Sequence, residues 1–337
     1  MATYYGTYGQ KVQYLASDPT DVQIGQVWYN STSATLKVRN VTTSGTFATG
    51  GNLGTAVYAN GGAGIQTASI SFGGRQVSGG LTDTGQTELY NGTSWTTNPT
   101  GLNTAKRTIG SAGTQTAALS FGGSLGSPNV YQSATESWNG SSWTNLPGTL
   151  NTARYNAGNG AGTQTAAIYS GGYNNSNLDN VETWNGSTWT NVTVYPAAKR
   201  DYILVGTQTA ALGAGGYPFP TTTSASYDGT SWTTNPGLAT ATASFAGFGT
   251  QTAAIGAGGY APGSNSIATV QIYNGTSWSN NPTGLNTSRY VMNSAKSSPG
   301  SVGAVFGGIP AYGQPTTTAT EEWNGPGTAQ TQTVTVT

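Results

Sequence analysis

One pattern returns along the chain at a nearly constant interval. The segment Gly-Thr-Gln-Thr-Ala-Ala recurs and is followed by a Gly-Gly pair, and successive pairs lie 43 to 49 residues apart. A period of about 20–50 residues indicates a unit that buries its faces against neighbouring copies of itself. The fold is therefore expected to be an array or a ring of similar units. The Gly pairs are Gly73-Gly74, Gly122-Gly123, Gly171-Gly172, Gly215-Gly216, Gly258-Gly259 and Gly307-Gly308.

A second signature follows each Gly pair, namely an aromatic residue directly before Asn-Gly or Asp-Gly. In five copies a Trp comes five residues after that aromatic. Asn, Asp and Gly tolerate positive φ, so these dipeptides predict tight hairpin turns. The first aromatics are Tyr90, Trp138, Trp184, Tyr227, Tyr273 and Trp323, and the second are Trp95, Trp143, Trp189, Trp232 and Trp278.

Each copy is expected to contain four short strands and almost no helix. In the second copy the strands are expected at residues 106–112, 115–122, 133–139 and 142–147, because no long run of helical period is present. Charged residues make up 7% of the chain, against about 25% in an average soluble protein, which is also typical of disordered linkers. The 9 Trp, 19 Tyr and 7 Phe indicate a packed core instead.

Six such units in series predict an all-β fold, a six-bladed β-propeller of four-stranded antiparallel blades with an N-terminal β-hairpin arm. A linear β-solenoid is the alternative, but its coils are usually shorter. We expect the arm and hairpin at residues 1–48, the propeller at residues 49–327 and a C-terminal strand or tail at residues 328–337.

The sixth copy lacks its second Trp, so a strand from elsewhere is needed to complete it. Residues 44–58 align with residues 93–107, and Phe47 takes the place of Trp95. A closing strand from this N-terminal segment would remove two exposed sheet edges at once. The alternating C-terminal segment Thr333–Thr337 is the alternative closing strand.

The segment before the first copy carries its own strand signals. Val27–Tyr29 and Leu36–Arg39 are expected to form a hairpin around Ser31–Ser33. Residues 1–22 have no clear period and are either a frayed end or a docking arm. The second reading is favoured by the aromatics Tyr4, Tyr5, Tyr8 and Tyr14.

The order of Gly-Gly, aromatic and Trp, at a period near 50, resembles the kelch repeat over about residues 50–325. It departs in one detail, since the aromatic-to-Trp spacing is five where kelch repeats commonly have six. The Thr/Asn/Gly-rich composition and the segment Gly25 to Asn40 resemble the kelch-like virion proteins of tailed bacteriophages. This resemblance implies a protein of the phage tail or fibre.

Charged residues recur at fixed places in the copies. A Glu stands two residues before the first aromatic, and a basic residue follows about 18 residues later; both are missing where Ala225 and Thr242 stand. We expect inter-blade ion pairs, with Glu136 contacting Arg154. A ring of catalytic carboxylates is the alternative. The acids are Glu88, Glu136, Glu182 and Glu321, and the bases are Lys106, Arg154, Lys199 and Arg289.

A Gln recurs at the turn between the first two strands of five copies. Its amide is expected to form a structural ring of hydrogen bonds, with ligand binding in a central channel as the alternative. These residues are Gln66, Gln115, Gln164, Gln208 and Gln251.

Several function classes are excluded by composition. The chain has no His and no Cys, so imidazole bases, Cys nucleophiles, disulfides and the copper site of galactose-oxidase-like kelch enzymes are ruled out. We therefore expect no enzyme, no catalytic residue, no metal and no cofactor; a carboxylate pair for polysaccharide hydrolysis is the remaining enzymatic alternative. A net charge of zero argues against nucleic-acid binding. No membrane insertion and no signal peptide are expected, because no long apolar stretch and no basic, apolar leader are present.

The loops between the second and third strands differ in every copy, whereas the other turns are nearly uniform. Variable loops on a rigid scaffold are where recognition usually resides, and Tyr, Asn, Gly and Ser suit adaptable binding surfaces. Unconstrained loops without function are the alternative. The candidate ligand-binding residues are Tyr131, Tyr173, Tyr217, Phe219, Tyr260 and Tyr312.

Together these features predict a non-enzymatic virion protein, assembled in the host cytoplasm. Its variable face is expected to meet a host-surface glycan or another virion protein, and residues 1–48 are expected to contact other virion proteins. The alternatives are a purely structural decoration or connector protein and a polysaccharide hydrolase. A homo-oligomer on the virion is compatible with either binding role.

Overall fold

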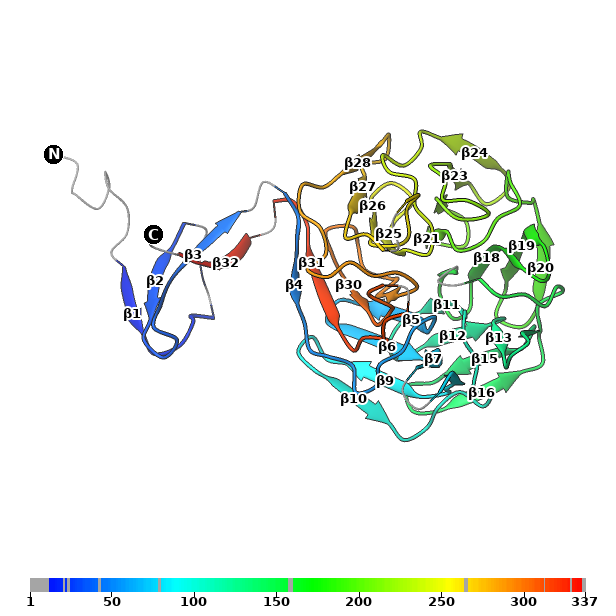
Figure 1. Ribbon diagram of the computed structural model, residues 1–337, viewed down its shortest axis with the longest axis horizontal. Helices are drawn as coiled ribbons and strands as arrows, with labels where there is room; N and C mark the ends of the chain where they lie inside the picture. Colours follow the sequence, from blue (N-terminus) through cyan, green and yellow to red (C-terminus); the bar gives the residue numbers. More distant parts are fainter. Residues whose placement is uncertain are drawn as a thin grey trace. The chain divides into compact units, whose positions relative to one another are not determined.

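The structure of the protein is a computed structural model that describes residues 12–20, 22, 25–41, 44–77, 80–156, 160–263, 266–311, 313–327 and 329–334. The chain divides into two compact units. Unit 1 comprises Met1–Gly45 with Gly325–Thr337, and unit 2 comprises Thr46–Asn324. The described residues form strands, turns and loops, and none of them forms a helix, let alone one able to cross a membrane (Figure 1).

Unit 1 is built around one four-stranded sheet. Its strand order is β1 (Gln13–Leu15), β2 (Val27–Asn30), β3 (Thr35–Val41) and β32 (Ala329–Thr333). β2 and β3 form an antiparallel hairpin, β1 runs parallel to β2, and β32 runs antiparallel to β3. The expected hairpin is therefore confirmed, and its sheet takes strands from both ends of the chain.

Asp18 ties this sheet together through three side chains. Its carboxylate accepts hydrogen bonds from Trp28 Nε1 at 3.0 Å, Asn30 Nδ2 at 2.7 Å and Lys37 Nζ at 2.6 Å. These hydrogen bonds lower the pKa of Asp18 to about 2, and the bond from Lys37 has the largest effect. The indole of Trp28 is fully buried by this arrangement.

Unit 2 contains six four-stranded sheets in its described part, together with the two-stranded pairs β7–β8 and β13–β14. Each four-stranded sheet is antiparallel, and we number them 1 to 6 in chain order of their first strands. Such sheets are those expected of propeller blades.

The strands of sheets 1 to 3, in the order from first to fourth, are β5 (Gly61–Ile65), β6 (Ala68–Phe72), β9 (Thr87–Tyr90) and β10 (Trp95–Asn98); β11 (Gly110–Gly113), β12 (Ala118–Phe121), β15 (Thr135–Trp138) and β16 (Trp143–Leu146); and β17 (Ala161–Gly162), β18 (Ala167–Tyr173), β19 (Asn177–Trp184) and β20 (Trp189–Val192).

The strands of sheets 4 to 6 are β21 (Ile203–Gly206), β22 (Ala211–Ala214), β23 (Ser224–Tyr227) and β24 (Trp232–Asn235); β25 (Ala246–Gly249), β26 (Ala254–Ala257), β27 (Val270–Tyr273) and β28 (Trp278–Asn280); and β29 (Asn293–Ser294), β30 (Val302–Phe306), β31 (Thr320–Asn324) and β4 (Thr46–Thr49). The two short pairs are β7 (Arg75–Gln76) with β8 (Thr82–Asp83) and β13 (Ser124–Leu125) with β14 (Val130–Tyr131).

The first strands of the sheets face one another around a common centre. β5, β11, β17, β21, β25 and β29 each contact the next, and β29 contacts β5 (Figure 1). The sheets therefore form a closed circle within unit 2.

A closed ring of hydrogen bonds joins the residues that precede these first strands, and we call it the collar. Each N–H donates to an oxygen of the preceding member, at 2.6 to 3.2 Å, and the first member donates to the last. Five of the six acceptors are backbone carbonyls, and the sixth is Oδ1 of Asn156. The members are Ala59, Thr108, Asn156, Asp201, Ser244 and Val291.

The circle is completed by a strand from the N-terminal side of the ring. β4 pairs with β31 as the fourth strand of sheet 6, and Phe47 lies opposite Trp323 as Trp95 lies opposite Tyr90 in sheet 1. The expected closure by the N-terminal segment is confirmed, and the C-terminal strand pairs with β3 instead. Unit 2 accordingly begins at Thr46 and ends at Asn324, three residues before each expected boundary.

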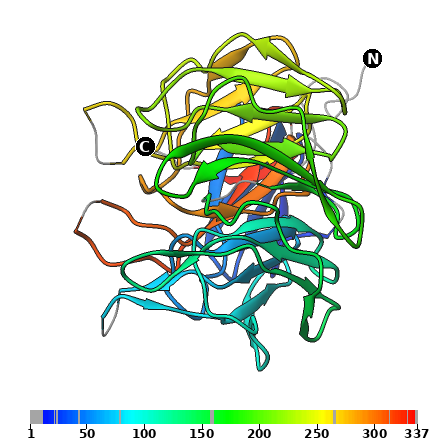
Figure 2. The same ribbon diagram turned by 90° about the vertical axis from the view of Figure 1, so that its right-hand side faces the viewer.

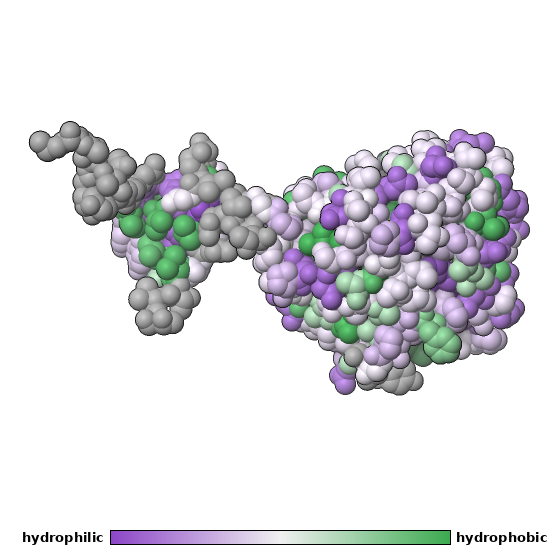
Figure 3. Space-filling view, turned by 90° about the horizontal axis from the view of Figure 1, so that it is seen from above, coloured by the Kyte–Doolittle hydropathy of each residue, from purple (hydrophilic) through white to green (hydrophobic). Residues whose placement is uncertain are grey.

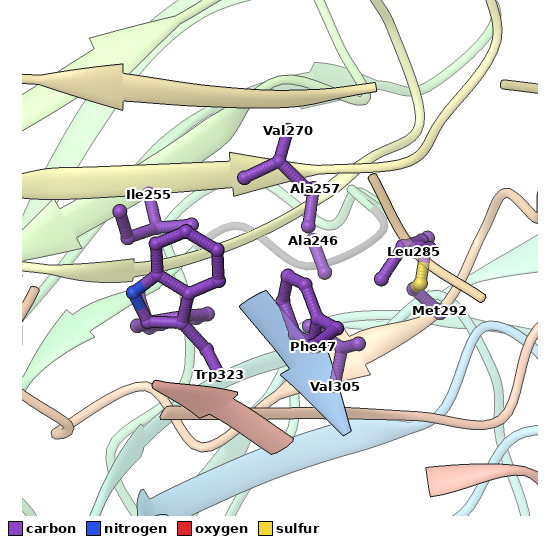
Figure 4. Packing of buried hydrophobic residues seen from close by; sticks show 10 residues of the cluster. Phe47, Ala246, Ile255, Ala257, Val270, Leu285, Met292, Val305 and Trp323 are labelled. Atoms are coloured by element: carbon purple, nitrogen blue, oxygen red, sulfur yellow. The ribbon is translucent and has the colours of Figure 1, made fainter. Parts of the chain in front are cut away.

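Phe47 also fills the core between sheets 5 and 6. Its ring lies 5.2 Å from that of Trp323, and both belong to one buried cluster with Ile255 and Val270 of sheet 5 and Leu285 of the connecting segment (Figure 4). The other sheets are joined by similar clusters of buried aromatic and aliphatic side chains.

The Trp of the fourth strand adds a polar contact to the preceding sheet. Nε1 of Trp143 donates to Oγ1 of Thr87, and Nε1 of Trp189 donates to Oγ1 of Thr135, each at 2.9 Å. Trp95 of sheet 1 makes the same bond to Thr320 of sheet 6 at 2.8 Å. The bond repeats across the closure point, so sheet 6 is joined to sheet 1 in the same way as sheet 1 to sheet 2 and sheet 2 to sheet 3.

The charged pairs form, but with partners other than those expected. Glu136 lies beside Lys106, at 3.3 Å from Nζ to Oε1, and Arg154 binds Glu182 through Nη1. The expected contact between Glu136 and Arg154 is therefore wrong. A third pair joins Arg289 to Glu321 at 3.0 Å. In all three pairs the base precedes its acid by 28 to 32 residues within one repeat, and both side chains are buried.

Two of the residues expected in these pairs, Lys199 and Glu88, have no ionic partner among the described residues. Nζ of Lys199 donates to the carbonyl of Gly215 at 2.9 Å and to Oγ1 of Thr223 at 2.8 Å, since Ala225 stands at the acid position. The carboxylate of Glu88 accepts from the backbone N–H groups of Gly54 and Thr55, and burial raises its pKa. Val57 stands at the corresponding base position and provides no charge.

The base position also holds neighbouring repeats together through its backbone. The second Gly of each pair donates its N–H to the carbonyl of the base-position residue in the next repeat, at 2.8 to 3.0 Å. Gly308 makes this bond to Val57 and so joins the last repeat to the first. At Gly123, φ is +101° and a Cβ would lie 2.7 Å from the carbonyl of Arg107, so this contact requires glycine.

The repeated Gln side chains make the expected structural hydrogen bonds at five of the six sheet junctions, and the turn of sheet 6 has no Gln to complete a ring. Nε2 of Gln115, Gln164, Gln208 and Gln251 donates to two carbonyls of the preceding sheet, at 2.5 to 3.2 Å. Gln66 donates to the carbonyl of Trp323 at 3.1 Å, across the closure point.

We predict that Phe47→Ala destabilises unit 2 by about 3–5 kcal/mol, because a buried ring at the closure would be replaced by a cavity. Chemical denaturation followed by Trp fluorescence measures this change. Tyr14→Ala, at a side chain that is 75% exposed in unit 1, serves as the control and should shift the midpoint little. Equal midpoints for Phe47→Ala and the unsubstituted protein would contradict a closing role for β4.

We also predict that stability rises with pH between about 7 and 9. Burial lowers the pKa of Lys199 from 10.5 to about 7, so the unfolded chain binds more protons than the folded chain over this range. Lys199→Met should reduce the slope of unfolding free energy against pH by up to about 1.4 kcal/mol per unit. Ala225→Glu should reduce it too, because a carboxylate would favour the ammonium. Unchanged slopes in both variants, by denaturation at each pH, would contradict the prediction.

Candidate functional site

The variable loops lie at the collar end of the ring. Each second strand runs antiparallel to its first strand and ends there, so the loops that follow the Gly pairs emerge at this end. Figure 2 shows three of these loops, in cyan, yellow and orange, on the same side of unit 2. The nearly uniform Thr-rich turns lie at the opposite end.

A cavity of about 230 Å³ opens at the collar. Four of its lining side chains come from the positions just before or after the collar residues or from a variable loop. They are Tyr58, Arg107, Tyr155 and Asn129. Ser124 and the collar residues Ala59, Thr108, Asp201, Ser244 and Val291 complete the wall.

Tyrosine rings and one guanidinium form a continuous arc beside this cavity. Tyr131 lies 5.9 Å from Tyr155 and 6.2 Å from Tyr173, measured between ring centroids. Arg200 lies over Tyr173 at 4.6 Å and over Tyr217 at 5.3 Å. The arc therefore spans the loops of sheets 2, 3 and 4, and each of these rings is partly exposed.

The arc ends at a stacked pair of rings. Tyr217 and Tyr260 lie 6.0 Å apart with an angle of 22° between their planes. Burial raises the pKa of Tyr217, and it raises that of Tyr155 to about 12, so these hydroxyls remain protonated donors near neutral pH. We call the residues Tyr131, Tyr155, Tyr173, Arg200, Tyr217 and Tyr260 the aromatic arc.

Four of the six predicted ligand-binding residues thus lie together in this arc. Phe219 lies apart from these ring contacts, on a loop, and is 79% exposed. Tyr312 lies outside the described residues. The six residues predicted as inter-blade pairs make buried structural contacts away from this arc, and the ion pairs among them lie within one repeat; they are Glu88, Lys106, Glu136, Arg154, Glu182 and Lys199.

The charged side chains at the cavity already have partners within the protein. Nη1 of Arg107 binds both carboxylate oxygens of Asp83 at 2.7 and 2.6 Å, and Arg75 binds the same carboxylate through Nε at 2.8 Å. Asp201 lies 3.4 Å from Nε of Arg200. The charged side chains of the site are therefore engaged within the protein, and rings, hydroxyls and amides make up the rest of its surface.

Asp83 also fixes two variable loops relative to each other. Its Oδ2 accepts the backbone N–H of Gly126 at 2.8 Å, and the carbonyl of Gly126 accepts from Arg75 and Arg107. A preorganised loop surface loses less conformational entropy when it binds a ligand.

Sequence reasoning missed Tyr58, Arg107, Tyr155, Arg200 and Asp201. All of them stand one or two residues after the base position of their repeat. Antiparallel bridges pair four of these sites with the residue after a Gly pair, as between Tyr155 and Tyr173 or Arg200 and Tyr217. The repeat alignment contained this signal, since aromatic or basic residues recur at that position.

Comparison with known proteins supports the fold. No protein-family model matches the chain, and no curated protein matches it. Among solved structures, one described as "Structure of YjhT" superimposes with a TM-score of 0.65 at 13% sequence identity, over 83% of this chain and 99% of that chain. YjhT has a kelch-type fold, so the likeness supports an all-β, propeller-type architecture built of four-stranded antiparallel sheets.

Proposed function

We propose that unit 2 is a six-bladed kelch-type β-propeller that binds a neutral glycan at its collar end and catalyses no reaction. The blade count is supported by the six four-stranded sheets of the described residues and by the cyclic contacts of their first strands. The binding role is carried by one observation, the aromatic arc beside a cavity of about 230 Å³.

The chemistry of the arc suits a sugar without charge. Tyrosine offers an apolar face and a polar hydroxyl, and such rings with a few placed polar groups are typical of small-molecule sites. The nearby Arg and Asp side chains are already paired, so an ionic ligand would have to compete with bonds inside the protein. Figure 3 shows the side of unit 2, away from the two ends of the ring, as mostly hydrophilic to neutral with small scattered hydrophobic patches.

We further propose that the protein belongs to a phage tail or fibre, with unit 1 contacting another virion protein. The resemblance of the Gly25–Asn40 hairpin to kelch-like virion proteins supports this placement, and so does the separate compact sheet of unit 1. A purely structural connector is the second candidate, favoured by that same sheet.

We predict that neutral oligosaccharides of a host surface bind the full chain and that Tyr173→Ala and Tyr217→Ala each weaken binding about tenfold, the usual scale for losing a central aromatic contact. A glycan array identifies the oligosaccharide, and isothermal titration measures the affinity. Phe219→Ala and Tyr14→Ala are matched controls outside the arc and should leave the affinity unchanged.

Two outcomes would contradict the glycan proposal. One is the absence of any glycan binding by the folded protein, which would favour the connector. The other is equal affinity in the arc variants and the controls, which would place the binding surface elsewhere. Hydrolysis of the bound oligosaccharide would overturn the non-catalytic part of the proposal.

A further inference from the structure

A second cavity lies at the opposite end of the ring, where the first strands end in the uniform turns. It has a volume of about 460 Å³. Its wall is formed by the first-to-second strand turns of sheets 3, 4 and 5 and by residues 296–299 of sheet 6. We call it the turn cavity. The volume lies within the range typical of small-molecule sites.

The turn of sheet 6 departs from the repeat and folds across the axis. By strand register, residues 296–303 (Lys-Ser-Ser-Pro-Gly-Ser-Val-Gly) stand where four other repeats have the shorter segment Gly-Thr-Gln-Thr-Ala-Ala. Ser297 donates its N–H to the carbonyl of Gly64 at 2.9 Å and its hydroxyl to that of Gly113 at 2.7 Å. This turn therefore rests against sheets 1 and 2, and the cavity is left over sheets 3 to 5.

Lys296 is the charged side chain among the residues that line the turn cavity, and no carboxylate lines it. The residue is 7% exposed, and its Nζ donates to the carbonyl of Gly160 at 3.2 Å. Burial lowers the pKa of this ammonium from 10.5 to about 7, because the charge is costly away from water. A negative group in the cavity would offset that cost.

The hydroxyl groups of the wall can supply further donors. Oγ of Ser298 is buried and has no hydrogen-bond partner within the described residues. Buried polar groups are rarely left unpaired, so this hydroxyl indicates a ligand or water partner. Oγ1 of Thr163 and Oγ1 of Thr207 each accept a backbone N–H at 3.1 Å, which leaves their own protons to be donated.

From this arrangement we propose that the turn cavity binds a small oxyanion, the carboxylate or phosphate group of a small molecule, between Lys296 and the hydroxyls of Ser298, Thr163 and Thr207. Charge-assisted hydrogen bonds to such a group are stronger than neutral ones. The site is distinct from the aromatic arc, because the two lie at opposite ends of the first strands.

The test is titration of the full chain with inorganic phosphate and with acetate, with chloride at equal ionic strength as the reference. Lys296→Met should weaken the binding of whichever oxyanion binds by at least about tenfold. Ser298→Ala should weaken it by a smaller factor and keep the fold, because the hydroxyl has no partner in the described protein. Lys199→Met is the matched control, a buried lysine that does not line the cavity, and should leave binding unchanged.

Binding of both anions, or of one, would support the proposal and distinguish phosphate from carboxylate as the preferred group. Binding of neither, or equal affinity in Lys296→Met, Ser298→Ala and Lys199→Met, would overturn it. Should Lys296→Met fail to fold, the unsubstituted protein gives the answer through amine labelling followed by mass spectrometry. Phosphate or acetate should slow the labelling of Lys296 and not that of Lys37. Labelling of Lys296 at the same rate with and without the anion would overturn the proposal.

Discussion

The collar is the interaction on which the architecture of unit 2 depends. Six hydrogen bonds in a closed circle fix where every first strand begins, and each sheet is held by the sheet before it and the sheet after it. Ala59, Thr108, Asp201, Ser244 and Val291 adopt φ between 51° and 55° to make these bonds. Such a conformation costs about 1–3 kcal/mol at a non-glycine residue, and most at β-branched Thr108 and Val291. The bonds persist because the closed circle over-determines each of these positions.

Beyond the collar, a small number of polar side chains align the strands and connecting segments, since few residues of the chain are charged. Three buried ion pairs, the Gln side chains and the Trp indoles all end on groups of an adjoining strand or connecting segment. Buried ion pairs contribute little net stability but penalise incorrect alignment, because a displaced partner leaves an uncompensated charge. Neutral Gln271 donates to Oγ1 of Thr242 where the fifth repeat lacks both charges. Polar contacts thus set the alignment of the sheets, and aromatic packing supplies most of the burial.

Much of the fold was predictable from the repeat, because strands, hairpins and closure all have local signatures. Phe47 could be assigned to sheet 6 because it replaces a Trp at a fixed place in the pattern. The partner of Glu136 could not be assigned in this way, since a periodic sequence places a base on both sides of every acid. Lys106 lies 30 residues before Glu136 and Arg154 lies 18 after it, and sequence distance favours the nearer one, which is the incorrect choice. The candidate site was predicted in part, because Tyr155 and Arg200 stand in connecting segments whose approach to the loops depends on tertiary structure.

The pairing of β4 with β31 also sets an order of events during synthesis. β4 leaves the ribosome first among the strands of unit 2, and β31 leaves it last. The edge of β4 has no native partner until nearly the whole chain has emerged, and contacts between such distant segments are slow to form. Sheets 1 to 5 each draw their four strands from one continuous segment and can assemble as they appear. A nascent chain therefore carries this open edge until β31 has been translated, and the interval before closure is when it is most exposed to pairing with another chain.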